Sequence, residues 1–101
     1  MYNIIISPEA LDEIQQSTSW YNLQQKSLGN RFFKNVKDCI KKIKKNPLAF
    51  QIRYNNFRGA IVSKFPFIVI YFIDNDNKII VVTAVFHTSR NPDSLNEKSF
   101  Y

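Results

Sequence analysis

Two long apolar runs near the carboxyl end constrain this chain more than any other feature. Residues 64–73 and residues 78–86 are rich in β-branched and aromatic side chains, and a polar turn of Asp and Asn at residues 74–77 separates them. Apolar runs of strand length around such a turn indicate a β-hairpin. Neither run alternates cleanly with polar residues, so we expect both faces of the sheet to be largely covered. The second run leads into His87 and Arg90, and polar side chains at the exit of a rigid hairpin are candidates for function.

The first half of the chain predicts a short strand followed by two helices. Residues 2–6 form a β-type run, and Ser7-Pro8 is a favoured helix start because Ser can cap the helix and Pro suits its first position. A second helix is expected from residue 27 or 28 to Lys45, where Asn46-Pro47 ends it. Two apolar-striped helices a few residues apart indicate an antiparallel helical hairpin. The stripe of the first helix is expected to consist of Leu11, Ile14, Thr18 and Tyr21.

Between the second helix and the hairpin the pattern is weaker. Residues 48–56 predict a loop or an irregular edge strand, and residues 57–63 predict a strand in which Gly59 marks a bulge or a close approach. The expected order is therefore β-α-α-β-β-β. This order predicts an α+β fold, with one mostly antiparallel sheet and the helical hairpin packed on one face. The 101 residues hold no linker-like segment, so residues 1–101 are expected to form a single domain.

The charge is concentrated in the middle of the chain. The net charge is +6, and eleven of the fourteen Lys and Arg residues lie between residues 26 and 64. Such a concentration favours an anionic partner, either a nucleic acid or an acidic polypeptide. A lysine-rich helix face can equally be a solvated face with no partner.

Other classes of site are not expected. Cys39 is the only cysteine, so no disulfide can form within the chain, and it is expected to be a small buried hydrophobe of the second helix. One His and one Cys offer few ligands, so we expect no metal and no cofactor. The apolar runs are too short to span a membrane, and the amino end does not resemble a signal peptide. We therefore expect a cytoplasmic protein with no membrane partner.

Several short motifs occur together in this chain. They are Pro8-Glu9-Ala10 with Asp12, Trp20-Tyr21, Leu28-Gly29 with Arg31-Phe32, Asn46-Pro47, Phe65-Pro66-Phe67 with Ile70-Tyr71, and Val85-Phe86-His87 with Arg90-Asn91-Pro92. In order and spacing they resemble the RelE/ParE family of toxins from bacterial type II toxin–antitoxin systems, most of all the ParE-type or plasmid-stabilization branch. The resemblance covers nearly the whole chain. It implies a small basic toxin that is neutralised by an acidic antitoxin, with either DNA gyrase or ribosome-bound mRNA as its target.

The residues offer candidates for each kind of chemistry. A metal-independent endoribonuclease needs an acid or base of near-neutral pKa and cations around the phosphate. His87 is the candidate acid or base, and Arg58 and Arg90 are the candidate phosphate clamps. Lys64 and Tyr101 are candidates for contacting the target or RNA. His87 can instead serve only to fix the strand exit, and Arg58 can instead pair with an acidic residue.

The resemblance also favours one target over the other. In the mRNA-cleaving members an Arg commonly lies in the strand that spans residues 67–71 here, where this chain has apolar residues and Tyr71. This favours a ParE-like inhibitor of DNA gyrase. The alternatives are a RelE-like ribosome-dependent endoribonuclease and a non-toxic member that only binds a partner. The residues expected to bind the antitoxin are Arg31, Lys34, Lys37, Lys41 and Lys44.

Overall fold

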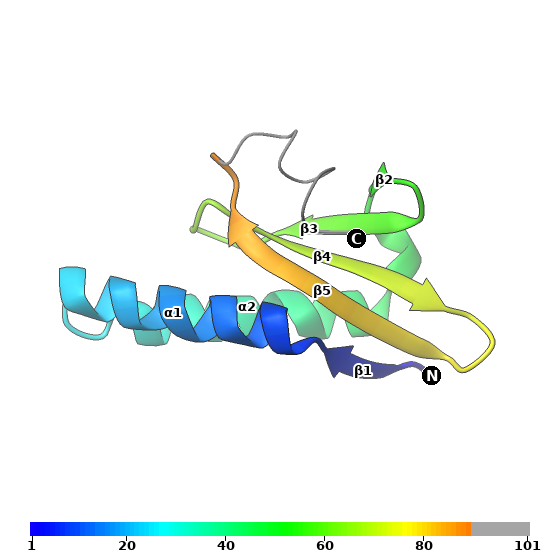
Figure 1. The fold of residues 1–101 in the computed structure, drawn as a ribbon, viewed down its shortest axis with the longest axis horizontal. Helices are drawn as coiled ribbons and strands as arrows, with labels where there is room; N and C mark the ends of the chain where they lie inside the picture. The colour runs from blue at the N-terminus through cyan, green and yellow to red at the C-terminus, as the bar shows by residue number, and fades with distance from the viewer. Residues whose placement is uncertain (90–101) are drawn as a thin grey trace.

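Two helices pack on one face of a five-stranded sheet in the computed structural model, which describes residues 1–89 (Figure 1). In chain order the elements are β1 (Asn3–Ile6), α1 (Pro8–Gln24), α2 (Leu28–Lys45), the 3-10 helix η1 (Pro47–Ala49), β2 (Ile52–Tyr54), β3 (Phe57–Ile61), β4 (Phe67–Asp74) and β5 (Ile79–His87). Arg90 and Tyr101, both candidate site residues, lie outside the described residues. Neither described helix is long and apolar enough to cross a membrane.

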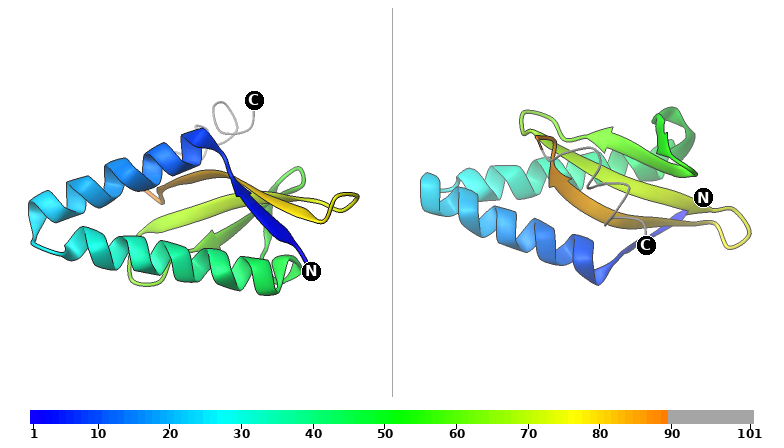
Figure 2. Two further views of the ribbon diagram at one scale, coloured as in Figure 1. Left: turned by 90° about the horizontal axis from the view of Figure 1, so that it is seen from below. Right: turned by 45° about the horizontal axis from the view of Figure 1, so that its top comes forward.

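The sheet has the strand order β1-β5-β4-β3-β2. β5 pairs in parallel with β1 and antiparallel with β4, and the remaining pairs are antiparallel. The α+β order and the mostly antiparallel sheet are therefore confirmed. Residues 48–56, predicted as a loop or an irregular edge strand, form η1 and the three-residue edge strand β2. Figure 2 shows both helices running along the same side of the sheet.

The start of α1 is fixed to the sheet by Ser7. Its Oγ accepts a hydrogen bond from the Ala10 N–H at 3.1 Å, as predicted for an N-cap, and donates to the Thr83 carbonyl at 3.2 Å. The expected stripe is wrong at one position. Leu11 is 44% exposed, whereas Ala10 and Ile14 are buried. Because the Ser7 hydroxyl is hydrogen-bonded to β5, the first turn of α1 directs Ala10 toward the sheet in place of Leu11.

The two helices approach each other closely at Gly29. A Cβ added to Gly29 would lie 2.0 Å from the Thr18 carbonyl oxygen, so no side chain fits between the helices at this position. The Gly29 N–H donates to Asn22 Oδ1 at 2.7 Å, which satisfies a backbone donor in the first turn of α2. From this contact α2 buries Phe32, Val36, Cys39 and Ile43 against the sheet.

A bulge in β5 changes which of its residues face the helices. Ile70 pairs with Ala84 and Tyr71 pairs with Val82, so Thr83 is an extra residue on β5. Before the bulge Val82 packs in the core under the helices, and after it Val85 does so. Ala84 belongs to a second buried cluster on the other face, with Ile68, Ile70 and Phe86. The bulge thus exchanges the two faces of β5 and turns His87 toward the helix side, where its ring lies 5.3 Å from that of Phe67.

Candidate functional site

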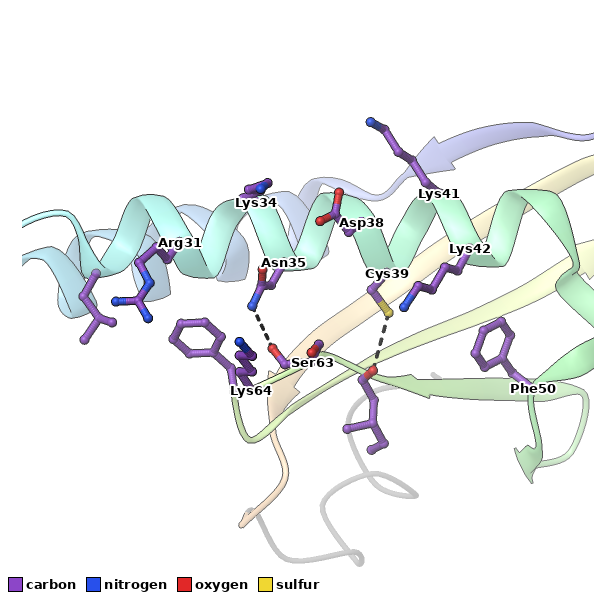
Figure 3. Close-up of a pocket in the computed structure, with 13 residues that line it drawn as sticks. Arg31, Lys34, Asn35, Asp38, Cys39, Lys41, Lys42, Phe50, Ser63 and Lys64 are labelled. Carbon is purple, nitrogen blue, oxygen red and sulfur yellow. Dashed lines mark hydrogen bonds between the residues drawn. The ribbon is translucent and has the colours of Figure 1, made fainter.

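A basic groove of about 810 Å³ lies between α2 and the connection from β3 to β4 (Figure 3). Its cations are Arg31, Lys34, Lys41 and Lys42 of α2 and Lys64 of the connection. Asp38 is the one acidic residue of the lining. Arg31 and Lys42 project from α2 toward the connection, whereas Lys41 points away from it (Figure 3). With five cations and one carboxylate in its lining, the groove is strongly positive.

The groove divides the predicted antitoxin-binding residues into two sets. Arg31, Lys34 and Lys41 line it. Lys37 and Lys44 do not, and the Lys37 ammonium lies 5.6 Å from the centre of the Phe33 ring instead. The division follows helix geometry, because a step of three residues falls about 60° short of a full turn. Lys37 and Lys44 therefore lie further round α2 than Lys34 and Lys41 and leave the lining of the groove. The same rule would have added Lys42 to the candidates from the sequence.

Contacts from Asn35 and Cys39 fix α2 to β3 and to the connection that follows it. Asn35 Nδ2 donates to the Ser63 carbonyl at 2.9 Å, which anchors the connection under the helix. Cys39 is 6% exposed and its thiol lies 3.8 Å from the Ala60 and Ile61 carbonyl oxygens. Burial raises the pKa of the Cys39 thiol to about 11, and Lys42 opposes this shift. Cys39 is therefore protonated at neutral pH and serves as the buried hydrophobe that the sequence predicts.

Arg58 is engaged by the chain itself. It lies on the helix side of β3, and its Nη1 donates to the carbonyl oxygen of Phe50 at 2.7 Å and to that of Leu48 at 3.5 Å. The neighbouring Tyr71 hydroxyl donates to the Pro47 carbonyl. Burial raises the pKa of Tyr71 to about 12, with an opposing effect of Arg58. Together these side chains hold η1 and the chain after it against the sheet.

His87 lies beside a second, smaller pocket of about 430 Å³. Its Nδ1 accepts a hydrogen bond from the Ser89 N–H at 3.1 Å, and the Ser89 hydroxyl lies 2.6 Å from the same nitrogen. An Nδ1 that accepts from the backbone places the proton of neutral imidazole on Nε2. The pocket is lined by Ser17, Trp20, Tyr21, Phe67, His87 and Ser89.

The structure does not bring Arg58 and His87 together. Arg58 pairs with Tyr71 of β4, and His87 pairs with Phe67, which is four residues away on the same strand. Since strands rise about 3.3 Å per residue and lie about 4.8 Å apart, the two Cα atoms are roughly 16 Å from each other. The Arg58 guanidinium is also directed to the carbonyls of Phe50 and Leu48, whereas His87 Nδ1 is bonded to Ser89. Lys64 joins the α2 groove instead.

Sequence reasoning missed the residues that shape the two pockets. Asn35 and Ser63 carry no functional signature, and their contact depends on the packing of α2 over the sheet. Trp20 is 56% exposed and lines the His87 pocket. The sequence did carry a signal for it, because Trp20 lies outside the stripe expected for the first helix. The bulge at Thr83, which brings His87 to this side, has no counterpart in the apolar pattern.

The fold is that of known toxins from toxin–antitoxin systems. The chain resembles the chromosomal ParDE system of P. aeruginosa with a TM-score of 0.77 and 12% identity, covering 88% of this chain and 98% of that one. It resembles the intact E. coli RelBE toxin–antitoxin complex with a TM-score of 0.68 and 15% identity, covering 89% and 100%. For the isolated E. coli RelE toxin the TM-score is 0.67 with 14% identity, covering 96% and 95%.

The sequence itself identifies the family. Residues 4–92 match the family model described as the ParE toxin of the type II toxin–antitoxin system parDE. This chain therefore belongs to the ParE toxin family. No curated protein sequence matches it.

Proposed function

We propose that this chain is the toxin of a type II module, that an acidic antitoxin neutralises it, and that its target is DNA gyrase, which it inhibits through protein–protein contact. The observation that carries the choice of target is the composition of β4. This strand, Phe67–Asp74, lies in the middle of the sheet and contains no Lys, Arg or His. A phosphate-cleaving centre on the sheet would need cations there to stabilise the charge of the transition state.

The engagement of Arg58 supports the same choice. Its guanidinium Nη1 is bonded to the carbonyls of Phe50 and Leu48, and its Cα lies roughly 16 Å from that of His87. An Arg that clamps a phosphate needs free donors in a fork facing the ligand. Arg58 is best explained as a structural residue, and inhibition by surface contact requires no catalytic cluster.

Overproduction of the chain without an antitoxin tests the choice of target. We expect growth to stop while plasmid DNA loses negative supercoiling, and we expect primer extension on translated messages to find no new cuts. New cuts within codons of translated mRNA, with supercoiling unchanged, would contradict gyrase as the target. Harmless overproduction would instead favour the non-toxic member.

One observation favours the RelE-like endoribonuclease as a second candidate. His87 borders a pocket with the exposed ring of Trp20, and its neutral form presents the Nε2 proton away from Ser89. Aromatic rings beside a general acid are suited to holding a splayed RNA base. Under this alternative, His87→Ala reduces mRNA cleavage about 100-fold or more, since a general acid contributes at least that factor. Under the gyrase proposal the same variant remains toxic.

The basic groove is the proposed site of the antitoxin. It collects four cations and one carboxylate along about three turns of α2, and Lys64 of the connection adds a fifth cation. Net positive charge in a channel attracts acidic segments and speeds their association. Lys37 and Lys44 lie outside the groove and are expected to contribute less to antitoxin binding.

A further inference from the structure

The outer surface of the helical hairpin carries a pocket that is separate from the basic groove and from the His87 pocket. It has a volume of about 430 Å³ and is lined by Gln15, Thr18 and Ser19 of α1 and by Asn30 and Phe33 of α2. Phe33 is 43% exposed at this pocket, and Leu11, about one turn of α1 before Gln15, is 44% exposed. Apolar side chains gathered around a pocket are typical of an interaction surface.

Charges of opposite sign lie on the two helices beside this pocket. Glu9 and Asp12 are exposed on α1 and form an acidic row, and Lys37 and Lys41 are exposed on α2 and form a basic row. Figure 2 shows the two helices running in opposite directions from the turn that joins them. At 1.5 Å per residue, Asp12 lies about 5 Å along α1 from the pocket, and Lys37 lies about 6 Å along α2 from it toward the same end of the hairpin. The two rows therefore run next to each other.

Within residues 1–89 the two rows do not neutralise each other. Asp12 Oδ2 accepts a hydrogen bond from Gln16 Nε2 at 2.7 Å, on its own helix. The Lys37 ammonium lies 5.6 Å from the centre of the Phe33 ring, also on its own helix. Both charges are therefore available to a partner that approaches the outer surface of the hairpin.

The side-by-side rows select a partner that carries both signs in the matching arrangement. An acidic segment would be repelled by the acidic row, and a basic segment by the basic row. A second copy, turned by 180° about an axis parallel to the helices, places its α1 over α2 of the first copy. Asp12 of each copy then faces Lys37 of the other, and each Phe33 ring faces the pocket of the other copy.

From the pocket, the exposed ring and the two rows of charge, we propose that two copies of this chain associate through the outer surfaces of α1 and α2. The helices have 17 and 18 residues. Together they present a surface of about 25 Å by 20 Å, or roughly 500 Å². A stable complex buries about 800 Å² on each partner, so this dimer belongs to the weak, micromolar class.

Sedimentation equilibrium of the full chain at about 0.15 M salt tests the proposal, because that salt screens the net charge of +6 over distances beyond about 8 Å. We expect a monomer–dimer equilibrium with a Kd on the order of 10 μM, which loading concentrations of about 1 to 200 μM would resolve. Phe33→Ala removes the ring from the centre of the contact and should weaken the dimer by about tenfold or more.

Two charge reversals test the arrangement of the copies. Asp12→Lys or Lys37→Glu alone sets like charges against each other twice in the dimer, and each should weaken it by at least about tenfold. An equal mixture of the two variants restores attraction at both places in a heterodimer. We expect the affinity of that heterodimer to lie within about threefold of the affinity of the unaltered dimer.

Lys26→Glu is the matched control, because Lys26 is exposed in the turn between the helices and the change in net charge equals that of Lys37→Glu. It should alter the affinity by no more than about threefold. Circular dichroism checks that each variant is folded, and Phe33→Ala carries the test alone if a charge variant is not. A monomer at about 200 μM, an unchanged dimer of Phe33→Ala, a mixture that associates no more tightly than either variant alone, or equal losses for Lys26→Glu and Lys37→Glu would overturn the proposal.

Discussion

The Arg58 guanidinium donates to the Phe50 carbonyl at 2.7 Å and thereby ties the segment after α2 to the sheet. This bond gives the cation on the helix side of β3 a partner within the chain. A residue that the sequence offers as a phosphate clamp therefore has a structural partner of its own. The proposed function depends on this distinction between a cation that is bonded within the chain and cations that are available to a partner.

Removing Arg58 should cost stability. Arg58→Ala deletes the bonds to Phe50 and Leu48, and we expect the free energy of unfolding to fall by about 1.5 kcal/mol, since bonds from charged donors are worth that much. Urea denaturation measures the change. Arg53→Ala, an exposed Arg on β2, is the matched control and should stay within about 0.5 kcal/mol. Equal stability of the two variants would argue against the structural role.

A methyl group at Gly29 should destabilise the helical hairpin. Ala normally stabilises a helix interior by about 1 kcal/mol relative to Gly. Here the new Cβ would meet the Thr18 carbonyl, and we expect a net loss of about 1–3 kcal/mol from overpacking. Asn30→Ala, the exposed neighbour, is the control and should be near neutral. Thermal unfolding of both variants checks this, and a more stable Gly29→Ala protein would refute the close approach.

The stability of the fold should decline in alkaline solution. Burial raises the pKa of Cys39 from 9.0 to about 11 and that of Tyr71 from 10.0 to about 12. A raised folded-state pKa of an acid means that its stabilising contribution is complete below the unfolded value and is lost as pH rises through the folded value. We therefore expect the free energy of unfolding to fall from about pH 9 upward.

Cys39→Ala isolates the thiol's share of that decline. The variant lacks the ionisable group, so the fall between about pH 9 and 10 should be shallower than in the unaltered chain. Urea denaturation at a series of pH values gives both curves. Parallel curves would show that the thiol is not buried as described.

Charge reversal should separate the groove from the rest of α2. Lys34→Glu with Lys41→Glu places two repulsive charges in the groove, and we expect the antitoxin complex to weaken by at least about tenfold at low salt. Lys37→Glu with Lys44→Glu makes the same change in net charge outside the groove and should weaken it by no more than about threefold. Titration calorimetry at two salt concentrations measures both. Equal losses would indicate that only the overall charge matters.

How much of the fold could be predicted depends on whether the interaction involves residues close together in the sequence or residues brought together by folding. The end of α2 at Lys45 was predictable because Asn46-Pro47 acts locally, and the Ser7 cap was predictable for the same reason. The bulge at Thr83 was not, because its neighbours are apolar on both sides and either parity is acceptable until the sheet is paired.

The candidate site, too, could be predicted only where the signal is local. Its α2 cations could be placed on one helix face from spacing alone. Lys64 could not be assigned to it, because its position depends on the Asn35 bond to the Ser63 carbonyl across a long sequence separation. The shortness of β2 is likewise not revealed by the weak pattern of residues 48–56.

The most direct test of the account is a supercoiling assay with purified DNA gyrase and the purified chain. We predict that the chain inhibits supercoiling, that His87→Ala inhibits equally, and that adding the antitoxin restores gyrase activity. Undiminished supercoiling at a molar excess of the chain, together with cleavage of translated mRNA that His87→Ala abolishes, would contradict the central claim.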